Sequence, residues 1–114
     1  MSSFEKTQTT YTPRYNITAE NVRTELAKYM LVDGFDFVLD LDNSRGAYFI
    51  EQRTGKKYLD FFTCFASMPL GLNHPKMISD SYLAYLNRAA LNKISNSDIY
   101  TDVMASFVKT FFET

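Results

Sequence analysis

The sequence is poor in the residue types that build disulfide frameworks and metal centres. Its 114 residues include one cysteine, Cys64, one histidine, His74, and no tryptophan. A single cysteine cannot form an internal disulfide, and a structural zinc site needs several Cys or His ligands. We therefore expect no metal site, no disulfide and a reducing, cytoplasmic setting.

The balance of charge and the hydropathy pattern exclude two further classes of partner. Lys and Arg number 12 against 13 Asp and Glu, so the formal net charge is −1, and the basic residues are scattered along the chain. A nucleic-acid-binding surface would need clustered positive charge. The polar N-terminus lacks the apolar stretch of a signal peptide, and no apolar run approaches the length of a membrane span. We predict neither a nucleic-acid partner nor a membrane partner.

Aromatic residues, by contrast, are abundant, with 8 Tyr and 10 Phe. In so short a chain this load indicates surfaces that are buried against other protein. The alternative is that the chain has an aromatic-rich core of its own.

Near the C-terminus, apolar residues recur at the spacing of one helix face: Ile99, Val103, Phe107 and Phe111. No Gly, Asn or Pro stop signal comes after them. We therefore expect the chain to be the front piece of a larger protein, truncated at Thr114.

The hydrophobic pattern predicts an α+β fold behind an N-terminal arm, residues 1–16, which has no hydrophobic period. Helical spacing begins after Thr18, the expected N-cap of a first helix. It returns after Pro75, since proline is favoured at the first position of a helix. A last helix is expected to follow Ser97 as its cap. The expected bounds of the three helices are 18–30, 75–91 and 98–114.

Between the first two helices lie three short runs of strand-forming residues, 37–41, 47–51 and 57–61, separated by turn sequences. Short runs joined by tight turns predict a three-stranded antiparallel meander. Such a small sheet is marginally stable unless one face packs on other structure. An irregular apolar stretch, residues 62–73, separates this meander from the second helix.

Motif analysis alone finds no complete active site. Cys64 lies among apolar residues and is interpreted as a buried, inert thiol. A lone histidine before a proline, as at His74, is more typical of a capping or packing residue than of a ligand. A Schiff-base lysine needs a desolvated pocket. The candidate lysines instead lie in polar turns or at helix ends: Lys56, Lys57, Lys76, Lys93 and Lys109.

One segment resembles a known family. Its landmarks are the triplet Tyr58-Leu-Asp, an apolar loop, and then Gly71-Leu-Asn-His-Pro. This order resembles the N-terminal part of the class III aminotransferases, which are pyridoxal-phosphate enzymes of fold type I. Residues 89–100, Ala-Ala-Leu-Asn-Lys-Ile-Ser-Asn-Ser-Asp-Ile-Tyr, are the most specific stretch and resemble the branch of the class that acts on the ε-amino group of L-lysine. Met68-Pro departs from the family pattern, in which two small residues are expected.

The resemblance implies a homodimeric parent enzyme that moves the ε-amino group of L-lysine to 2-oxoglutarate, giving 2-aminoadipate 6-semialdehyde and glutamate. It also implies that residues 17–114 form the N-terminal small-domain segment and the start of the large domain. The site of the cofactor, pyridoxal 5'-phosphate, and the Schiff-base lysine would lie outside these residues. We therefore assign no catalytic and no cofactor-binding residue, and we expect this fragment alone to be inactive.

Two groups of residues acquire expected roles from the same resemblance. Phe65, Ala66 and Ser67 would line the substrate channel, whereas Asn96 and Ser97 would lie at the dimer interface near an active site. Two alternatives stay open at this point. One is another class III ω-amine transaminase, acting on ornithine or 4-aminobutyrate, and the other is a non-catalytic α+β interaction module.

Overall fold

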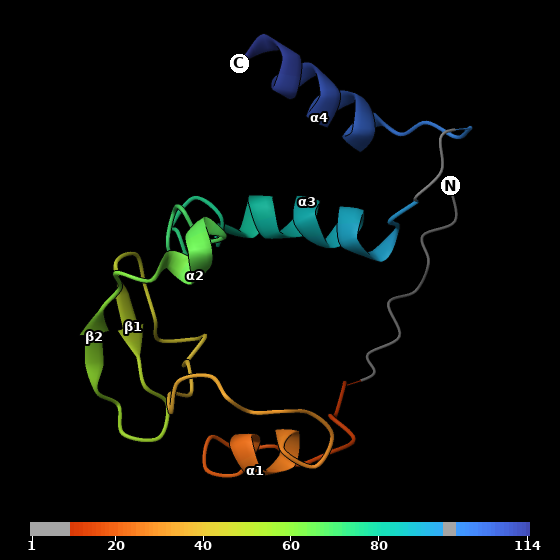
Figure 1. Ribbon diagram of the computed structural model, residues 1–114. Coiled ribbons are helices and arrows are strands. Elements are labelled where there is room, and N and C mark those ends of the chain that lie inside the picture. Colours follow the sequence, from red (N-terminus) through yellow and green to blue (C-terminus); the bar gives the residue numbers. More distant parts are fainter. Residues whose placement is uncertain (1–9, 95–97) are drawn as a thin grey trace. The chain divides into compact units, whose positions relative to one another are not determined.

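A computed structural model describes residues 10–94 and 98–114 of the chain (Figure 1). These residues divide into two compact units. The first comprises the described residues up to Ser44 together with Tyr48–Asp60, and the second comprises Arg45–Ala47 together with Phe61–Thr114. The elements in chain order are α1 (Val22–Leu26), β1 (Tyr48–Ile50), β2 (Lys57–Leu59), α2 (Thr63–Ala66), α3 (Asp80–Leu91) and α4 (Asp102–Glu113).

The first helix, α1, is shorter than the sequence predicts and begins at Val22 instead of following Thr18. Residues 18–21 form a turn, in which the Asn21 and Val22 N–H groups donate to the Thr18 carbonyl oxygen over 3.1 and 3.0 Å. The Thr18 N–H donates to Oδ1 of Asn21 over 2.8 Å and so closes this turn. Asn21 is the N-cap of α1. The expected N-cap role of Thr18 is thus wrong.

Strands β1 and β2 pair antiparallel, with Tyr48 opposite Leu59 and Ile50 opposite Lys57. The predicted first strand, residues 37–41, contributes only one bridge, between Leu39 and Glu51. The sheet of the first unit therefore has two strands, and the prediction of a third full strand is wrong.

The side chain of Asp40 explains why the pairing of residues 37–41 stops so early. Its Oδ1 accepts hydrogen bonds from the backbone N–H groups of Asp42 and Asn43 over 3.0 and 2.9 Å. Its Oδ2 accepts a third bond from the Asn43 side-chain amide over 2.8 Å. Asp side chains that bind the backbone two residues on stabilise turns. The chain therefore bends away from β1 directly after Asp40.

Both longer helices of the second unit begin later than expected. Residues 75–79 form a turn, in which Met77 and Ile78 donate to the carbonyl oxygen of His74, and α3 starts at Asp80. The cap of α4 is Thr101, whose Oγ1 accepts from the Met104 N–H over 3.1 Å. The expected cap, Ser97, lies outside the described residues.

Burial in the described residues is unusual, because no apolar side chain among them is buried. The two buried residues are polar, Ser44 and Glu51. Large aromatic side chains on α4, including Phe107 and Phe111, stay mostly exposed. This pattern favours the interpretation that the aromatic load serves surfaces covered by other protein over the alternative of an aromatic core. Within the same described residues, no helix combines the length and apolarity needed to cross a bilayer.

Candidate functional site

The apolar stretch that the sequence marks as irregular contains a left-handed turn, α2. The backbone φ angles of Thr63, Cys64, Phe65 and Ala66 are 48°, 47°, 56° and 63°. None of the four is a glycine, and each L-residue in this conformation costs about 1–2 kcal/mol relative to the right-handed form. Residues in such sparsely populated conformations persist where the surrounding structure holds them, and they concentrate at ligand sites. This turn is therefore the first candidate for a functional element.

Local hydrogen bonds hold the left-handed turn in place. The hydroxyl of Thr63 donates to the Phe62 carbonyl oxygen over 2.8 Å and accepts from the Ala66 N–H over 3.2 Å. The hydroxyl of Ser67 donates to the Cys64 carbonyl oxygen over 2.7 Å. Backbone groups inside the turn are thus partnered by side chains of the turn itself, which offsets part of its conformational cost.

The three residues expected to line the substrate channel lie together in and beside this turn. Phe65 is 89% exposed, and its ring meets that of Phe62 edge-on with 4.8 Å between centroids. Ala66 and Ser67 are exposed as well. Cys64, however, is only half-buried, so the expectation of a buried thiol is wrong. The reason is that the turn lies at the surface of its unit, with little chain around it.

A contact between two glycines anchors the C-terminal end of this loop. The Gly46 N–H donates to the Leu72 carbonyl oxygen over 3.0 Å, and the two residues form an antiparallel bridge. Gly71 has φ of 69°, and a Cβ atom added there would stand 2.1 Å from the Gly46 carbonyl oxygen. Only glycine fits this position. In the sequence, Gly71 stands out only as a family landmark. Its contact with Gly46 could not be predicted, because no local sequence pattern signals it.

The other expected site, Asn96 and Ser97, lies outside the described residues. Residues on either side of it line a hollow of about 740 Å³, among them Lys93, Ile94 and Thr101. The Arg88 guanidinium donates to both carboxylate oxygens of Asp102 across this hollow, over 2.5 and 2.6 Å. The hydrogen bond with Arg88 lowers the pKa of the Asp102 carboxyl, and the same contact raises the pKa of Arg88.

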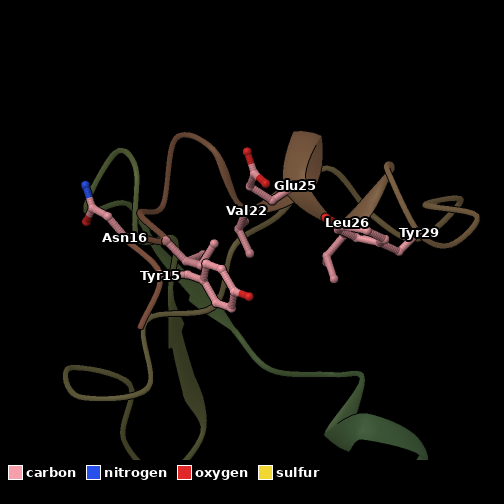
Figure 2. Close-up of a pocket in the computed structure, with 7 residues that line it drawn as sticks. Tyr15, Asn16, Val22, Glu25, Leu26 and Tyr29 are labelled. Carbon is pink, nitrogen blue, oxygen red and sulfur yellow. The ribbon is translucent and has the colours of Figure 1, made fainter. Parts of the chain in front are cut away.

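A second hollow, of about 610 Å³, lies beside α1 in the first unit (Figure 2). Figure 2 shows the Tyr15 ring and the side chain of Val22 on α1 directed toward the same space. Ile17 also lines it. The carboxylate of Glu25 is engaged by Lys28 over 2.7 and 2.8 Å. The lining is therefore mainly apolar, without a set of groups suited to acid–base chemistry.

The described residues do not fit a pyridoxal-phosphate site. Every lysine among them is exposed, whereas a Schiff-base lysine needs a desolvated pocket. Lys57, for example, places its Nζ atom 3.8 Å from the centroid of the Tyr48 ring at the surface of the hairpin. His74 has a structural role, because its Nδ1 accepts from the Lys76 N–H over 3.3 Å. In this part of the chain, no group of three or more His, Cys, Asp or Glu could hold a metal ion.

Comparisons with known proteins agree with the family resemblance of the segment from Tyr58 to Pro75. No protein-family model matches the chain. Among curated proteins it is 48% identical over 97 residues to the L-lysine-epsilon aminotransferase of Streptomyces clavuligerus, covering 84% of this chain and 21% of that protein. It is 50% identical over 95 residues to the enzyme of the same name from Mycobacterium tuberculosis, covering 82% and 21%. A more distant match is the diaminobutyrate–2-oxoglutarate transaminase of Wolinella succinogenes, at 33% over 78 residues, covering 68% and 17%.

The fold agrees with these matches. The structure of lysine aminotransferase from M. tuberculosis in its internal aldimine form has a TM-score of 0.81 to this chain, at 48% sequence identity, over 85% of this chain and 22% of that one. The described residues thus share the fold of part of an aminotransferase. Within that class, the chain belongs to the L-lysine-epsilon aminotransferase family and matches the N-terminal part of its members. It spans 21% of the length of these curated relatives.

Proposed function

We propose that the protein carrying this chain is a pyridoxal-phosphate-dependent aminotransferase of fold type I. It moves the ε-amino group of L-lysine to 2-oxoglutarate and yields 2-aminoadipate 6-semialdehyde and glutamate. The observation that carries this proposal is identity of 47–50% to five proteins named L-lysine-epsilon aminotransferase, over 82–84% of the chain. A match of this level over most of the chain, with a matching fold, supports a shared reaction.

The cofactor is held by parts of the enzyme outside these residues, because no described lysine occupies a desolvated pocket. When bound, it supplies the electron sink for the reaction. This segment contributes part of the substrate-channel wall and part of the interface between the two subunits. Phe65, Ala66 and Ser67 line the substrate channel, and Asn96 and Ser97 lie at the interface of a homodimer near an active site. Residues 17–114 belong to the small domain and the start of the large domain, in a cytoplasmic enzyme.

The apolar surface of the segment fits this role. The described part of the chain buries no apolar side chain, while Phe107 and Phe111 on α4 are each 69% exposed. Apolar area of this extent is stabilising only when other protein covers it. The remaining domains of the enzyme, and the second subunit, would provide that cover.

A second candidate is transfer from another ω-amine. The match to the diaminobutyrate–2-oxoglutarate transaminase supports it, because that protein is named for a shorter diamine. Its identity of 33% is lower than the 50% to a lysine enzyme, which is why we place L-lysine first.

The test is a substrate panel on the purified native protein, whose intact mass should lie far above 13.2 kDa. Glutamate formation from 2-oxoglutarate is measured with L-lysine, L-ornithine, 2,4-diaminobutyrate and 4-aminobutyrate as amine donors. We expect kcat/KM to be highest for L-lysine, by about tenfold or more, since one methylene in a pocket discriminates by roughly 10–200-fold. A maximum with another donor would establish the second candidate. No glutamate from any donor, or a native mass near 13.2 kDa, would instead support a non-catalytic interaction module.

A further inference from the structure

We propose that Gly71 is a positioning residue for the substrate channel, acting through its contact with Gly46. This inference rests on the proposed function, because it assigns Phe65 to the channel wall. The contact lets the loop of residues 61–72 close back onto Gly46, and the closed loop holds the left-handed turn that presents the Phe65 ring. Neither glycine touches the reacting atoms, so their effect on the reaction is indirect.

Geometry at Gly71 supports the inference. Its φ of 69° is a left-handed conformation, and an added Cβ atom would meet the carbonyl oxygen, carbonyl carbon and Cα of Gly46 at 2.1, 2.6 and 2.7 Å. All three atoms are backbone atoms, so no side chain can move aside. Any substitution must therefore separate residues 71 and 72 from residue 46 and break the bond between the Gly46 N–H and the Leu72 carbonyl oxygen.

Two backbone hydrogen bonds carry that displacement from Gly71 to the turn that contains Phe65. The Gly71 N–H donates to the Met68 carbonyl oxygen over 3.0 Å, and the Met68 N–H donates to the Thr63 carbonyl oxygen over 3.3 Å. These two bonds link the glycine contact to the first residue of the turn. Four consecutive left-handed residues are unfavourable without such support, so a loop released at Gly71 should relax toward ordinary conformations.

The chain offers a matched control for a Gly71→Ala variant. Gly55 has the same φ of 69°, and an added Cβ atom at that position has no atom within 4 Å. Gly55→Ala therefore introduces the same left-handed strain without the steric clash. The difference between Gly71→Ala and this control isolates the contact itself.

The experiment measures amine selectivity in the full-length enzyme as the ratio of kcat/KM for L-lysine to that for 2,4-diaminobutyrate. We expect Gly71→Ala to change this ratio about tenfold, mainly through KM, and the Gly55→Ala control to change it less than about twofold. The double variant Gly71→Ala/Phe65→Ala should change it no more than Phe65→Ala alone, because the two residues act as one unit. Additive effects, or equal effects in Gly71→Ala and Gly55→Ala, would overturn the inference.

Hydrogen exchange separates this inference from the proposed function. Gly71→Ala should speed exchange of the Gly46 amide and of amides in residues 61–72 by about tenfold, leaving residues 48–59 unchanged, as expected for local opening. A wild-type enzyme without transaminase activity refutes the proposed function, while unchanged exchange in Gly71→Ala refutes the anchoring role of the Gly71–Gly46 contact.

A second pair of variants covers the case in which Gly71→Ala does not fold. Thr63→Val removes the hydroxyl that bonds Phe62 and Ala66, and Thr63→Ser retains it. A selectivity change in Thr63→Val that Thr63→Ser lacks would support the loop's role, and equal kinetics would overturn it.

Discussion

The guanidinium of Arg53 donates a hydrogen bond from Nε to the carboxylate of Glu51 over 2.7 Å, and Glu51 is only 3% exposed. The same carboxylate accepts from the Val38 N–H over 3.2 Å and from the N–H and hydroxyl of Thr54 over 2.9 Å each. Arg53 also reaches Asp36 over 2.9 Å. A charged group can be buried when its oxygens are satisfied in this way. A polar cluster centred on Glu51 thus organises the first unit in place of an apolar core.

Stability of this unit should depend on pH through Glu51. Removal from water would raise its pKa, but hydrogen bonds from Arg53, Thr54 and Val38 outweigh that effect and lower the pKa from 4.5 to about 2. A depressed carboxyl pKa stabilises the folded state above the unfolded value and loses this effect as pH falls through the folded value. We therefore expect the urea midpoint to fall between pH 4.5 and about 2.

The variant Glu51→Gln should have a lower urea midpoint at pH 7 and a weaker pH dependence in the same window, because the amide nitrogen would face hydrogen-bond donors. The matched control is Glu20→Gln, at an exposed position. Equal midpoints and equal pH profiles for the two variants would contradict the role assigned to Glu51.

Removal of the Phe65 ring should weaken catalysis of the full-length enzyme. Phe65→Ala is expected to raise KM for L-lysine or lower kcat/KM by about tenfold, equivalent to about 1.4 kcal/mol of transition-state stabilisation. Phe61 offers a control of the same residue type and the same exposure, 89%, outside the left-handed turn. Steady-state kinetics with Phe65→Ala and Phe61→Ala should therefore differ, and indistinguishable kinetic constants would remove Phe65 from the channel wall.

The two long helices differ in how their N-termini are capped. Thr101 at the start of α4 accepts from the Met104 N–H through its side chain, whereas Ser79 at the start of α3 makes no such bond. Thr101→Ala should reduce the free energy of unfolding by about 1 kcal/mol, the usual worth of a side-chain cap. Ser79→Ala should cost less, and urea titration of both variants checks the ranking. A larger loss in Ser79→Ala would show that the cap bond contributes little.

The proposed interface role of Asn96 can be tested by adding a charge there. Two copies of Asn96→Asp would bring unpaired carboxylates close to a homodimer interface, which should raise the dimer dissociation constant by about tenfold or more, since buried unpaired charge is costly. Analytical ultracentrifugation of the full-length enzyme measures it. Asn16→Asp, at an exposed position, is the control. Dimerisation and activity equal to wild type would count against an interface at Asn96.

Much of the secondary structure could be predicted, but its boundaries could not. Helices near 18–30, 75–91 and 98–114 and a hairpin between 47 and 61 follow from periodicity and turn residues. The starts of α1 and α3 were misplaced because turns precede these helices, closed by bonds to the Thr18 and His74 carbonyl oxygens. The third strand was lost because the Asp40 side chain binds the backbone N–H groups of Asp42 and Asn43 and stabilises a turn.

The α+β composition, the order of the elements and the resemblance to an aminotransferase follow from the sequence alone. Each of these depends on residues that are neighbours along the chain. Contacts in three dimensions were needed to establish that the buried carboxylate of Glu51 accepts from the Val38 N–H and that Gly71 lies against Gly46. Those features depend on packing and on contacts between residues far apart in sequence, where backbone sterics and hydrogen-bond satisfaction choose one arrangement and no local pattern encodes it.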